Sequence, residues 1–425
     1  MSREAIALIG LLLLGCDAPG AGEHASGRGP ARVAAQRPHE TSSAPRRSEN
    51  GASSAPGAQR ANGPGPHSVS TRRVRIGAAG DLLVHVKVAR AAADHADAGG
   101  MLHVLGDLPS VIEPDEIAFI NVETPLVDDE VPVGNGAPPI LGSPPAMAEA
   151  LARAGFDVAS LANNHALDQG SRGLRRSIEA LERAGVRVVG AASTYARAYD
   201  PVIVERDGLR VAFIAFTERM NQGPRQRPPE AYAARLANEA SVLEALRRAR
   251  QQADLVVASV HWSYDFAPAP TRDQRNLARR LVEHGADLVI GHGPHIVHGV
   301  QRLRSARGDA FVAYSLGNVL SNQGLRYRAG DGILTSEPER FDGRARDNVW
   351  LRVPVEVDAS GTIHIGRPTA VLLWTRNNHY ERASGREQRV DIRPIRLGRI
   401  GDEGLRAERR DHLARVLGPE VDLVD

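Results

Sequence analysis

The chain contains the segment Ser160-Leu161-Ala162-Asn163-Asn164-His165-Ala166-Leu167-Asp168-Gln169-Gly170, in which a polar cluster follows an apolar run. The apolar run at residues 156–162, which leads into it, has the length and flanks of a buried parallel strand. The polar cluster then follows the carboxyl end of that strand, where open α/β sheets bind ligands. An amide oxygen and an imidazole at such a turn can coordinate a metal or move a proton. The alternative is a strand-to-helix turn in which Asn and Asp only cap backbone groups.

The length and composition of the chain limit its domain number, its partners and its cysteine chemistry. The chain has 425 residues, enough for one large domain or two with a sizeable core. A formal net charge of +2 gives no indication of a nucleic-acid partner. The single cysteine, Cys16, excludes an intrachain disulfide and leaves no thiolate for a zinc site elsewhere in the chain.

The amino-terminal segment has the pattern of an export signal. An apolar stretch at residues 5–14 follows Arg3 and is too short to span a bilayer. It ends in Leu13-Leu14-Gly15-Cys16, which resembles the lipobox of bacterial lipoproteins. We therefore expect residues 1–16 to be a lipoprotein signal peptide, and a lipidated Cys16 to anchor the protein to a membrane, facing the periplasm or the exterior. The alternative is an ordinary secretory signal that contains a cysteine.

Two further regions follow this signal. Residues 17–71 are rich in Gly, Ala, Ser, Pro and Arg and have almost no large apolar side chains. Such a segment cannot bury enough surface to offset its ordering entropy, so we expect a disordered tether. Residues 72–425 show no internal repeat, and we expect them to form one catalytic-type domain.

Hydrophobic periodicity predicts alternating strands and helices within this domain. Strands are expected at residues 74–81, 117–123, 156–162, 186–191, 255–262, 286–292 and 311–316, and helices at 147–154, 173–184, 232–252, 271–284 and 403–417. Asp207-Gly208, between residues 201–205 and 209–216, predicts a two-residue hairpin turn. We expect a long polar loop at 324–346 and antiparallel strands at 349–357 and 362–374. The alternation predicts an α/β fold with a parallel or mixed layered sheet.

Five of the apolar strands end in polar groups that suit metal binding. These endings are Asp81, Glu123, Asn163-Asn164-His165, His261, and His292 with His295. A lone histidine is more often structural, but the recurrence at strand ends predicts that these groups share one rim of a sheet. Oxygen ligands together with neutral imidazoles suit Mn, Fe or Zn better than Ca. The number of ligands predicts two divalent metals, with a carboxylate able to bridge both ions.

The same motifs carry a family resemblance. Their order resembles that of the CapA/PgsA family, and the segments concerned are Gly80-Asp81, Asn121-Val122-Glu123, Ala162 to Gly170, His261-Trp262, Gly291-His292-Gly293-Pro294-His295 and Tyr314-Ser315-Leu316-Gly317-Asn318. The resemblance covers about residues 74–320. These are bacterial capsule synthesis proteins linked to poly-γ-glutamate, similar in fold to calcineurin-like metallophosphoesterases. The resemblance implies a metallophosphoesterase-like layered α/β sandwich, with metal-site loops at the carboxyl ends of strands.

The resemblance also implies a role for each matching residue. Asp81 and His295 resemble first-metal ligands, and Glu123 stands at the bridging position. Asn164, His261 and His292 resemble second-metal ligands. His165 resembles the general acid that protonates a leaving group. Asp168 then orients His165 through a hydrogen bond, or it caps the helix that starts near Gly170; both alternatives stay open.

The chain departs from the superfamily pattern at three points. The Asp-x-His motif is here Asp81-Leu-Leu-Val-His85, the bridging residue is Glu instead of Asp, and the final pair is His-x-x-His instead of His-x-His. Each departure can reshape a metal site. His85 and Asn163 therefore remain candidates for metal ligands or for residues that support the ligands.

Three functions are compatible with these features. The first is a membrane-anchored protein of capsule or poly-γ-glutamate synthesis or export, with a dinuclear hydrolase-like site for a phosphoester or amide bond. The second is a non-enzymatic accessory lipoprotein that binds the polymer or its synthase, and the third is a secreted metallophosphatase. The expected partners are the membrane, a capsule polymer synthase complex, and an anionic polymer or phosphoester substrate, with no nucleic acid.

Overall fold

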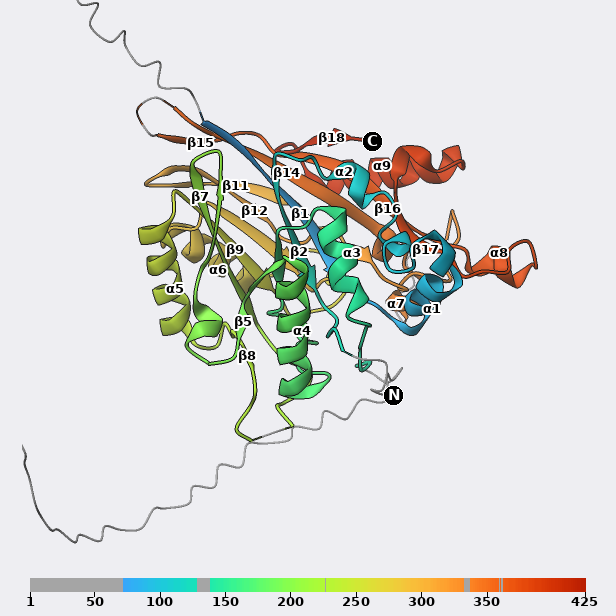
Figure 1. Cartoon of the computed structure of the whole chain (residues 1–425). Coiled ribbons are helices and arrows are strands. Elements are labelled where there is room, and N and C mark those ends of the chain that lie inside the picture. Colours follow the sequence, from blue (N-terminus) through green and yellow to red (C-terminus); the bar gives the residue numbers. More distant parts are fainter. Residues whose placement is uncertain (1–71, 128–137, 226, 332–336, 359, 361) are drawn as a thin grey trace, which may run out of the picture. The chain divides into compact units, whose positions relative to one another are not determined.

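A computed structural model of the chain describes residues 72–127, 138–225, 227–331, 337–358, 360 and 362–425 (Figure 1). The expected signal peptide, Cys16 and the expected tether at residues 17–71 lie outside the described residues. Within the described part of the chain, no helix combines the length and the apolar character needed to cross a membrane.

The larger of two main sheets is mixed and ten-stranded in the described residues, in the order β17-β16-β14-β1-β2-β3-β4 with three strands beside this path. Strands β1 to β4 run parallel, whereas β14 pairs antiparallel with β1. The bounds are β1 Arg72–Leu82, β2 Glu116–Val122, β3 Val158–Ser160, β4 Arg187–Val189, β13 Asn318–Leu320, β14 Asp347–Val357, β15 Ile363–Ile365, β16 Thr369–Asn377, β17 Ile392–Arg396 and β18 Asp422–Val424.

The second sheet has six strands in the order β11-β12-β10-β9-β7-β6. Its bounds are β6 Val202–Arg206, β7 Leu209–Thr217, β9 Leu255–His261, β10 Leu288–His292, β11 Val300–Ser305 and β12 Gly308–Ala313. The predicted hairpin is confirmed, because β6 and β7 pair antiparallel around Asp207-Gly208. Both turn residues have positive φ, 52° and 71°, as a type I′ turn requires.

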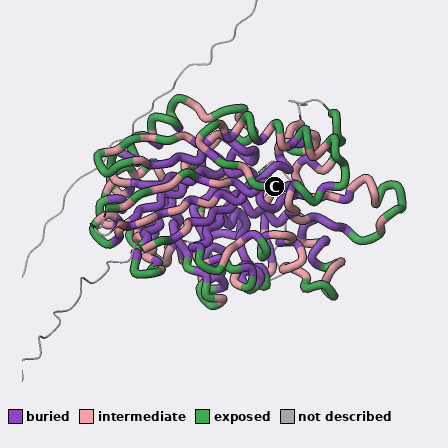
Figure 2. The backbone as a smooth tube through the Cα atoms, turned by 90° about the horizontal axis from the view of Figure 1, so that it is seen from above, coloured by how far each residue is buried: buried purple, intermediate pink, exposed green. Residues whose placement is uncertain are grey.

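Helices cover the outer face of each sheet, so the domain has four layers (Figure 1). On the larger sheet lie α1 Val86–Asp94, α2 Leu108–Val111, α3 Ala146–Ala154 and α4 Gly170–Ala184. On the smaller sheet lie α5 Glu239–Gln252 and α6 Arg272–Glu283. Strand β2 is buried on both faces, with Phe119 toward the other sheet and Ile120 toward the helices, which explains its unbroken apolar run. Figure 2 shows the buried backbone concentrated in this interior.

The predicted α/β sandwich is confirmed, but three local predictions were wrong. Residues 232–252 are not one helix: β8 Tyr232–Ala233 pairs with β5 Ala191–Ala192, and α5 begins only after Asn238, whose side chain accepts from Ser241 N. The strand predicted at 362–374 is divided into β15 and β16 around Pro368. The loop predicted at 324–346 contains the short helix α7 Pro338–Phe341.

Two further helices and a capping motif complete the described elements. Helix α9 has the predicted bounds, Glu403–Leu417, and α8 His379–Ala383 lies before β17. Helix α6 begins with a capping box, in which Thr271 and Gln274 each satisfy the other's backbone N–H. This motif explains why the predicted start of α6 agrees with the structure to within a residue.

Candidate metal centre

The predicted site residues come from both sheets, at the carboxyl ends of their central parallel strands. Asp81 near the end of β1 lies in register with Asn121 of β2, and Glu123 directly follows β2. In the second sheet, His261 at the end of β9 lies in register with His292 at the end of β10. The pairing of neighbouring parallel strands thus brings distant parts of the sequence to one place.

Asp81 is fully buried and is the most heavily bonded of these residues. Its Oδ1 accepts a hydrogen bond from Asn121 Nδ2 (2.8 Å), and its Oδ2 accepts one from Gly293 N (2.9 Å). His292 Nδ1 lies 3.1 Å from Oδ1, and His295 Nδ1 lies 3.5 Å from Oδ2. Burial alone would raise the pKa of Asp81, but the two imidazoles outweigh it and hold that pKa well below its usual value. The carboxylate is therefore ionised and fixed in orientation.

The pKa of Glu123 is shifted in the opposite direction from that of Asp81. Burial, with the nearby charge of Asp81, raises the pKa of Glu123 well above its usual value. Its Oε1 lies 3.5 Å from His261 Nε2, and burial lowers the pKa of His261 to about 3. Glu123, His261 and Asp81 each offer one ligand atom, and these three atoms lie within 4.8 Å of one another. A neutral imidazole and two carboxyl groups at this spacing are a metal-ligand set.

Several ligand atoms of the site have no hydrogen-bond partner among the described residues. These buried atoms are Glu123 Oε1 and Oε2, Asn164 Oδ1, and His292 Nδ1 and Nε2. Leaving one buried polar group unsatisfied costs roughly 1–3 kcal/mol, and more for a charged group. A cation that accepts oxygen and nitrogen ligands would satisfy the oxygens of Glu123 and Asn164 and one ring nitrogen of His292. The residues present therefore fit a divalent metal ion, with Mn, Fe and Zn the metals that such mixed ligands prefer.

His165 is held in one orientation by its neighbours. Its Nδ1 lies 2.6 Å from Asp168 Oδ2, and its Nε2 lies 3.4 Å from Asn221 Nδ2. Asp168 also accepts from Leu141 N (2.8 Å), whereas the residue before α4 is Gln169 and makes no side-chain cap. The helix-cap alternative for Asp168 is therefore wrong, and its carboxylate faces His165.

The loop after β10 has an unusual backbone. His295 has φ of +62°, a left-handed conformation that costs a residue other than glycine about 1–3 kcal/mol. Its Nδ1 lies 3.0 Å from Asn318 Oδ1, which holds the ring against Asp81. At Gly293, with φ of +100°, any Cβ would collide with the carbonyl oxygen of Trp262. The loop is thus built to bring His295 back over the strand ends.

His85 and Asn163, the two remaining candidates for metal ligands or for residues that support the ligands, make different contacts. His85 directly precedes α1, and its Nδ1 accepts from Asn322 N (3.3 Å). Burial lowers the pKa of His85 to about 4, and His165 and His295 add to the effect. Asn163 donates through Nδ2 to Val122 O (2.9 Å), so it ties the loop after β3 to the end of β2. Asn163 therefore has a structural contact, although its Oδ1 has no partner in the described residues.

Three residues that contact the site, Asn121, Asn318 and Asn221, had no role assigned from the sequence. Asn121 and Asn318 both stand inside the family motifs, and they orient Asp81 and His295. Asn221, which faces His165, lies in a separate loop, and nothing in its spacing marks it. Its backbone N–H donates to Asn164 O (2.8 Å), so the contact depends on the tertiary fold alone.

Comparison with known proteins supports the same family. The sequence profile of the family described as "Bacterial capsule synthesis protein PGA_cap" matches residues 75–323. The chain is 31% identical to the capsule biosynthesis protein CapA of Bacillus anthracis over 201 residues, 46% of this chain and 47% of that protein. It is 28% identical to the PGA biosynthesis protein CapA of Bacillus subtilis (strain 168) over 211 residues, 48% of this chain and 51% of that protein.

A solved structure is also similar to this chain. A phosphatase from Mycoplasma pneumoniae aligns with 71% of this chain and 94% of its own, with 12% identity and a TM-score of 0.41. The chain spans about half the length of the curated relatives it matches. The family profile spans more than half of the chain and includes the candidate site from Asp81 to His295. This chain therefore belongs to the family of bacterial capsule synthesis proteins, PGA_cap.

Proposed function

We propose that this protein takes part in the synthesis or export of a capsule polymer of the poly-γ-glutamate kind, and that its strand-end site is a metal-dependent hydrolytic centre. The family and the names of its Bacillus relatives support the first part. The second part rests on one observation above all: buried oxygen and nitrogen atoms of Glu123, Asn164 and His292 converge without hydrogen-bond partners.

The proposal assigns a task to each side chain. Asp81 and His295 would hold one divalent metal, and Asn164, His261 and His292 would hold a second. Glu123 would add its carboxylate to this centre, and Mn, Fe and Zn are the metals proposed. Metals bound there would supply Lewis-acid polarisation of a phosphoester or amide and a water activated for attack.

His165 completes the chemistry as general acid. With its Nδ1 facing Asp168, the ring presents Nε2, which can give a proton to the leaving group at a distance of one hydrogen bond. Asp168 fixes the ring plane and stabilises the protonated imidazole. Asn221 Nδ2, 3.4 Å from Nε2, is then displaced from the ring or turned by the incoming substrate.

The proposal places the protein in the cell envelope. A lipidated Cys16 would hold the domain at a membrane surface, facing the periplasm or the exterior, beside a polymer synthase complex and its anionic product. Replacing Cys16 with Ala and fractionating the cells tests the anchor. The expected result is release of the protein from the membrane fraction; unchanged membrane association would remove the anchor from the proposal.

Metal content is the measurement that tests the centre. The full chain, together with Glu123→Ala and His292→Ala, is reconstituted with Mn, Fe or Zn and analysed for bound metal. The ligand set predicts about two equivalents bound at the strand ends of the wild type, and less bound metal in both variants. An exposed histidine serves as the matched control: His284→Ala is expected to bind as much as the wild type.

The opposite result favours the non-enzymatic alternative. If no metal binds above background after reconstitution, the polar strand ends are a binding groove, and the protein is an accessory lipoprotein for the polymer or its synthase. Co-purification with a membrane synthase would then be expected under gentle extraction. A secreted metallophosphatase is distinguished by rapid turnover of small phosphoesters across a broad panel.

A further inference from the structure

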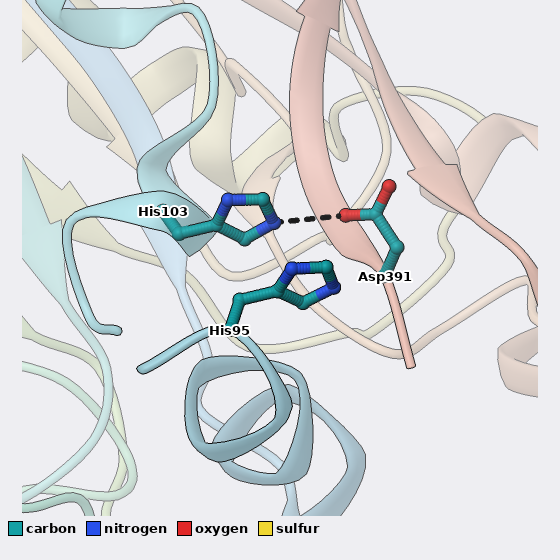
Figure 3. Close-up of side chains that lie close together, drawn as sticks. All are labelled: His95, His103 and Asp391. Atoms are coloured by element: carbon teal, nitrogen blue, oxygen red, sulfur yellow. Dashed lines mark hydrogen bonds and ion pairs between the residues drawn. The ribbon is translucent and has the colours of Figure 1, made fainter. Parts of the chain in front are cut away.

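A second group of metal-ligating side chains lies outside the centre described above. His95 follows α1, His103 begins a short 3₁₀ turn at His103–Leu105, and Asp391 directly precedes β17. The two imidazole rings are stacked, with centroids 4.0 Å apart and planes within 9° (Figure 3). His103 Nε2 lies 3.2 Å from Asp391 Oδ1. Each residue offers one ligand atom, and the three atoms lie within 4.8 Å of one another.

The burial of these side chains and an unpartnered ring nitrogen suit metal binding. Asp391 is 5% exposed, and the His103 side chain is 12% exposed. His95 Nε2 is buried and has no hydrogen-bond partner in the described residues. Two imidazoles therefore stack with one ring nitrogen left unsatisfied, which costs roughly 1–3 kcal/mol.

Two arginines also contact Asp391, and they leave one oxygen facing the histidines. Arg376 pairs with Oδ2 and also contacts Glu387 (2.7 Å), so its charge is shared between two carboxylates. Arg393 Nε lies 3.1 Å from Oδ1 but has no hydrogen bond there. Oδ1 thus lies near both Arg393 and His103, and Figure 3 marks its contact with His103.

We propose that His95, His103 and Asp391 form a mononuclear Zn²⁺ site, separate from the strand-end centre. Two imidazole nitrogens and one carboxylate oxygen, with water in the fourth position, make a tetrahedral Zn²⁺ set, whereas Ca²⁺ and Mg²⁺ prefer oxygen alone. Metal binding requires the stacked rings to turn about their Cβ–Cγ bonds, a broad torsion for histidine. The ion would join the α1 region to Asp391, which lies 288 residues after His103 and directly precedes β17.

The site is tested by counting bound zinc. The full chain is stripped with a chelator, given Zn²⁺ alone, gel-filtered, and analysed for zinc and for its unfolding temperature. His95→Phe keeps a stacked ring beside His103 but removes both nitrogens. The expected result is one equivalent of zinc fewer than the wild type and a smaller zinc-induced rise in unfolding temperature. His364→Phe is the matched control, because it removes an exposed histidine paired with Asp358 (2.9 Å) and should leave the zinc count unchanged.

The difference between wild type and His95→Phe does not depend on the strand-end centre. Glu123→Ala lowers the zinc count of both proteins equally, so a failure at one site is distinguishable from a failure at the other. Equal zinc content in wild type and His95→Phe would overturn the proposal. If His95→Phe shows no cooperative unfolding, His103→Gln is measured in its place, with the same expected loss and the same contradicting result.

Discussion

At the scale of single residues, His165 separates metal binding from proton transfer. The ring of His165 contacts Asp168 through Nδ1, and neither of its nitrogens is proposed as a metal ligand. His165→Ala is therefore expected to keep its bound metal while turnover falls by about 10²–10⁴-fold, the usual contribution of a general acid. Metal analysis and hydrolysis of the best substrate from a phosphoester and amide panel measure the two effects. Full complementation of a deletion strain by this variant would contradict the catalytic role.

Asp168 gives a finer prediction at the same scale. In Asp168→Asn, the amide oxygen can still accept from Leu141 N, so the loop should keep its fold. Leu141 N and His165 Nδ1 both contact Oδ2, so that amide oxygen also keeps its contact with the ring, but the neutral amide no longer stabilises a protonated imidazole. We expect at least a tenfold loss of turnover with an unchanged unfolding midpoint. A loss of stability that matches the loss of turnover would show instead that Asp168 only supports the loop.

At the scale of elements, the close approach of β1 to the segment before β13 depends on a glycine. Asp81 N donates to Gly317 O (2.9 Å), and a Cβ on Gly80 would collide with that same carbonyl. Gly80→Ala is expected to reduce the free energy of unfolding by about 1–3 kcal/mol, as overpacking does, and to lower metal content by displacing Asp81.

Urea unfolding measures this change, with Gly401→Ala as the control. A Cβ on Gly401 would have no neighbouring atom within 4 Å, so the control midpoint should equal that of the wild type. Equal midpoints for Gly80→Ala and Gly401→Ala would show that the two segments separate without cost.

Local patterns explain which elements the sequence could predict. The core strands were predictable because both of their faces are buried, and α6 because Thr271 and Gln274 form a capping box. The start of α5 was not predictable, because the strand at Tyr232–Ala233 pairs with Ala191–Ala192, a segment distant in sequence. Strand β17 and the contact between Asn221 and His165 escaped prediction for the same reason. The strand-end residues were predictable as a group, since parallel strands end at one edge.

At the scale of the whole molecule, the site exists only because two sheets face each other. The larger sheet supplies Asp81 and Glu123, and the smaller supplies His261, His292 and His295. The carboxylates of Asp81 and Glu123 therefore meet these three imidazoles only where the two sheets face each other. The apolar core between the sheets, which includes Phe119 and Phe213 with ring centroids 5.7 Å apart, therefore sets the distance between the two halves of the centre.

Buried histidines also make the folded domain sensitive to acid. Burial lowers the pKa values of His85, His103 and His412 to about 4, and that of His261 to about 3. Between these values and the ordinary 6.5, the unfolded chain binds more protons than the folded one, so stability rises with pH. Each of these imidazoles makes its full contribution to the free energy of unfolding above pH 6.5, and the contribution is lost as the pH falls toward 4. Each group adds a slope of at most about 1.4 kcal/mol per pH unit.

His412 tests this sensitivity away from either proposed metal site, because it lies in α9 with its Nε2 3.9 Å from Asp347 Oδ2. His412→Gln cannot take up a proton, so the free energy of unfolding should fall less steeply between pH 6.5 and 4 than in the wild type. Urea titrations at each pH, on metal-free protein, measure the slope, with His284→Gln at an exposed position as the control. Equal slopes for wild type and His412→Gln would mean that the imidazole of His412 stays accessible to protons in the folded domain. Its burial in α9 would then add nothing to the loss of stability between pH 6.5 and 4.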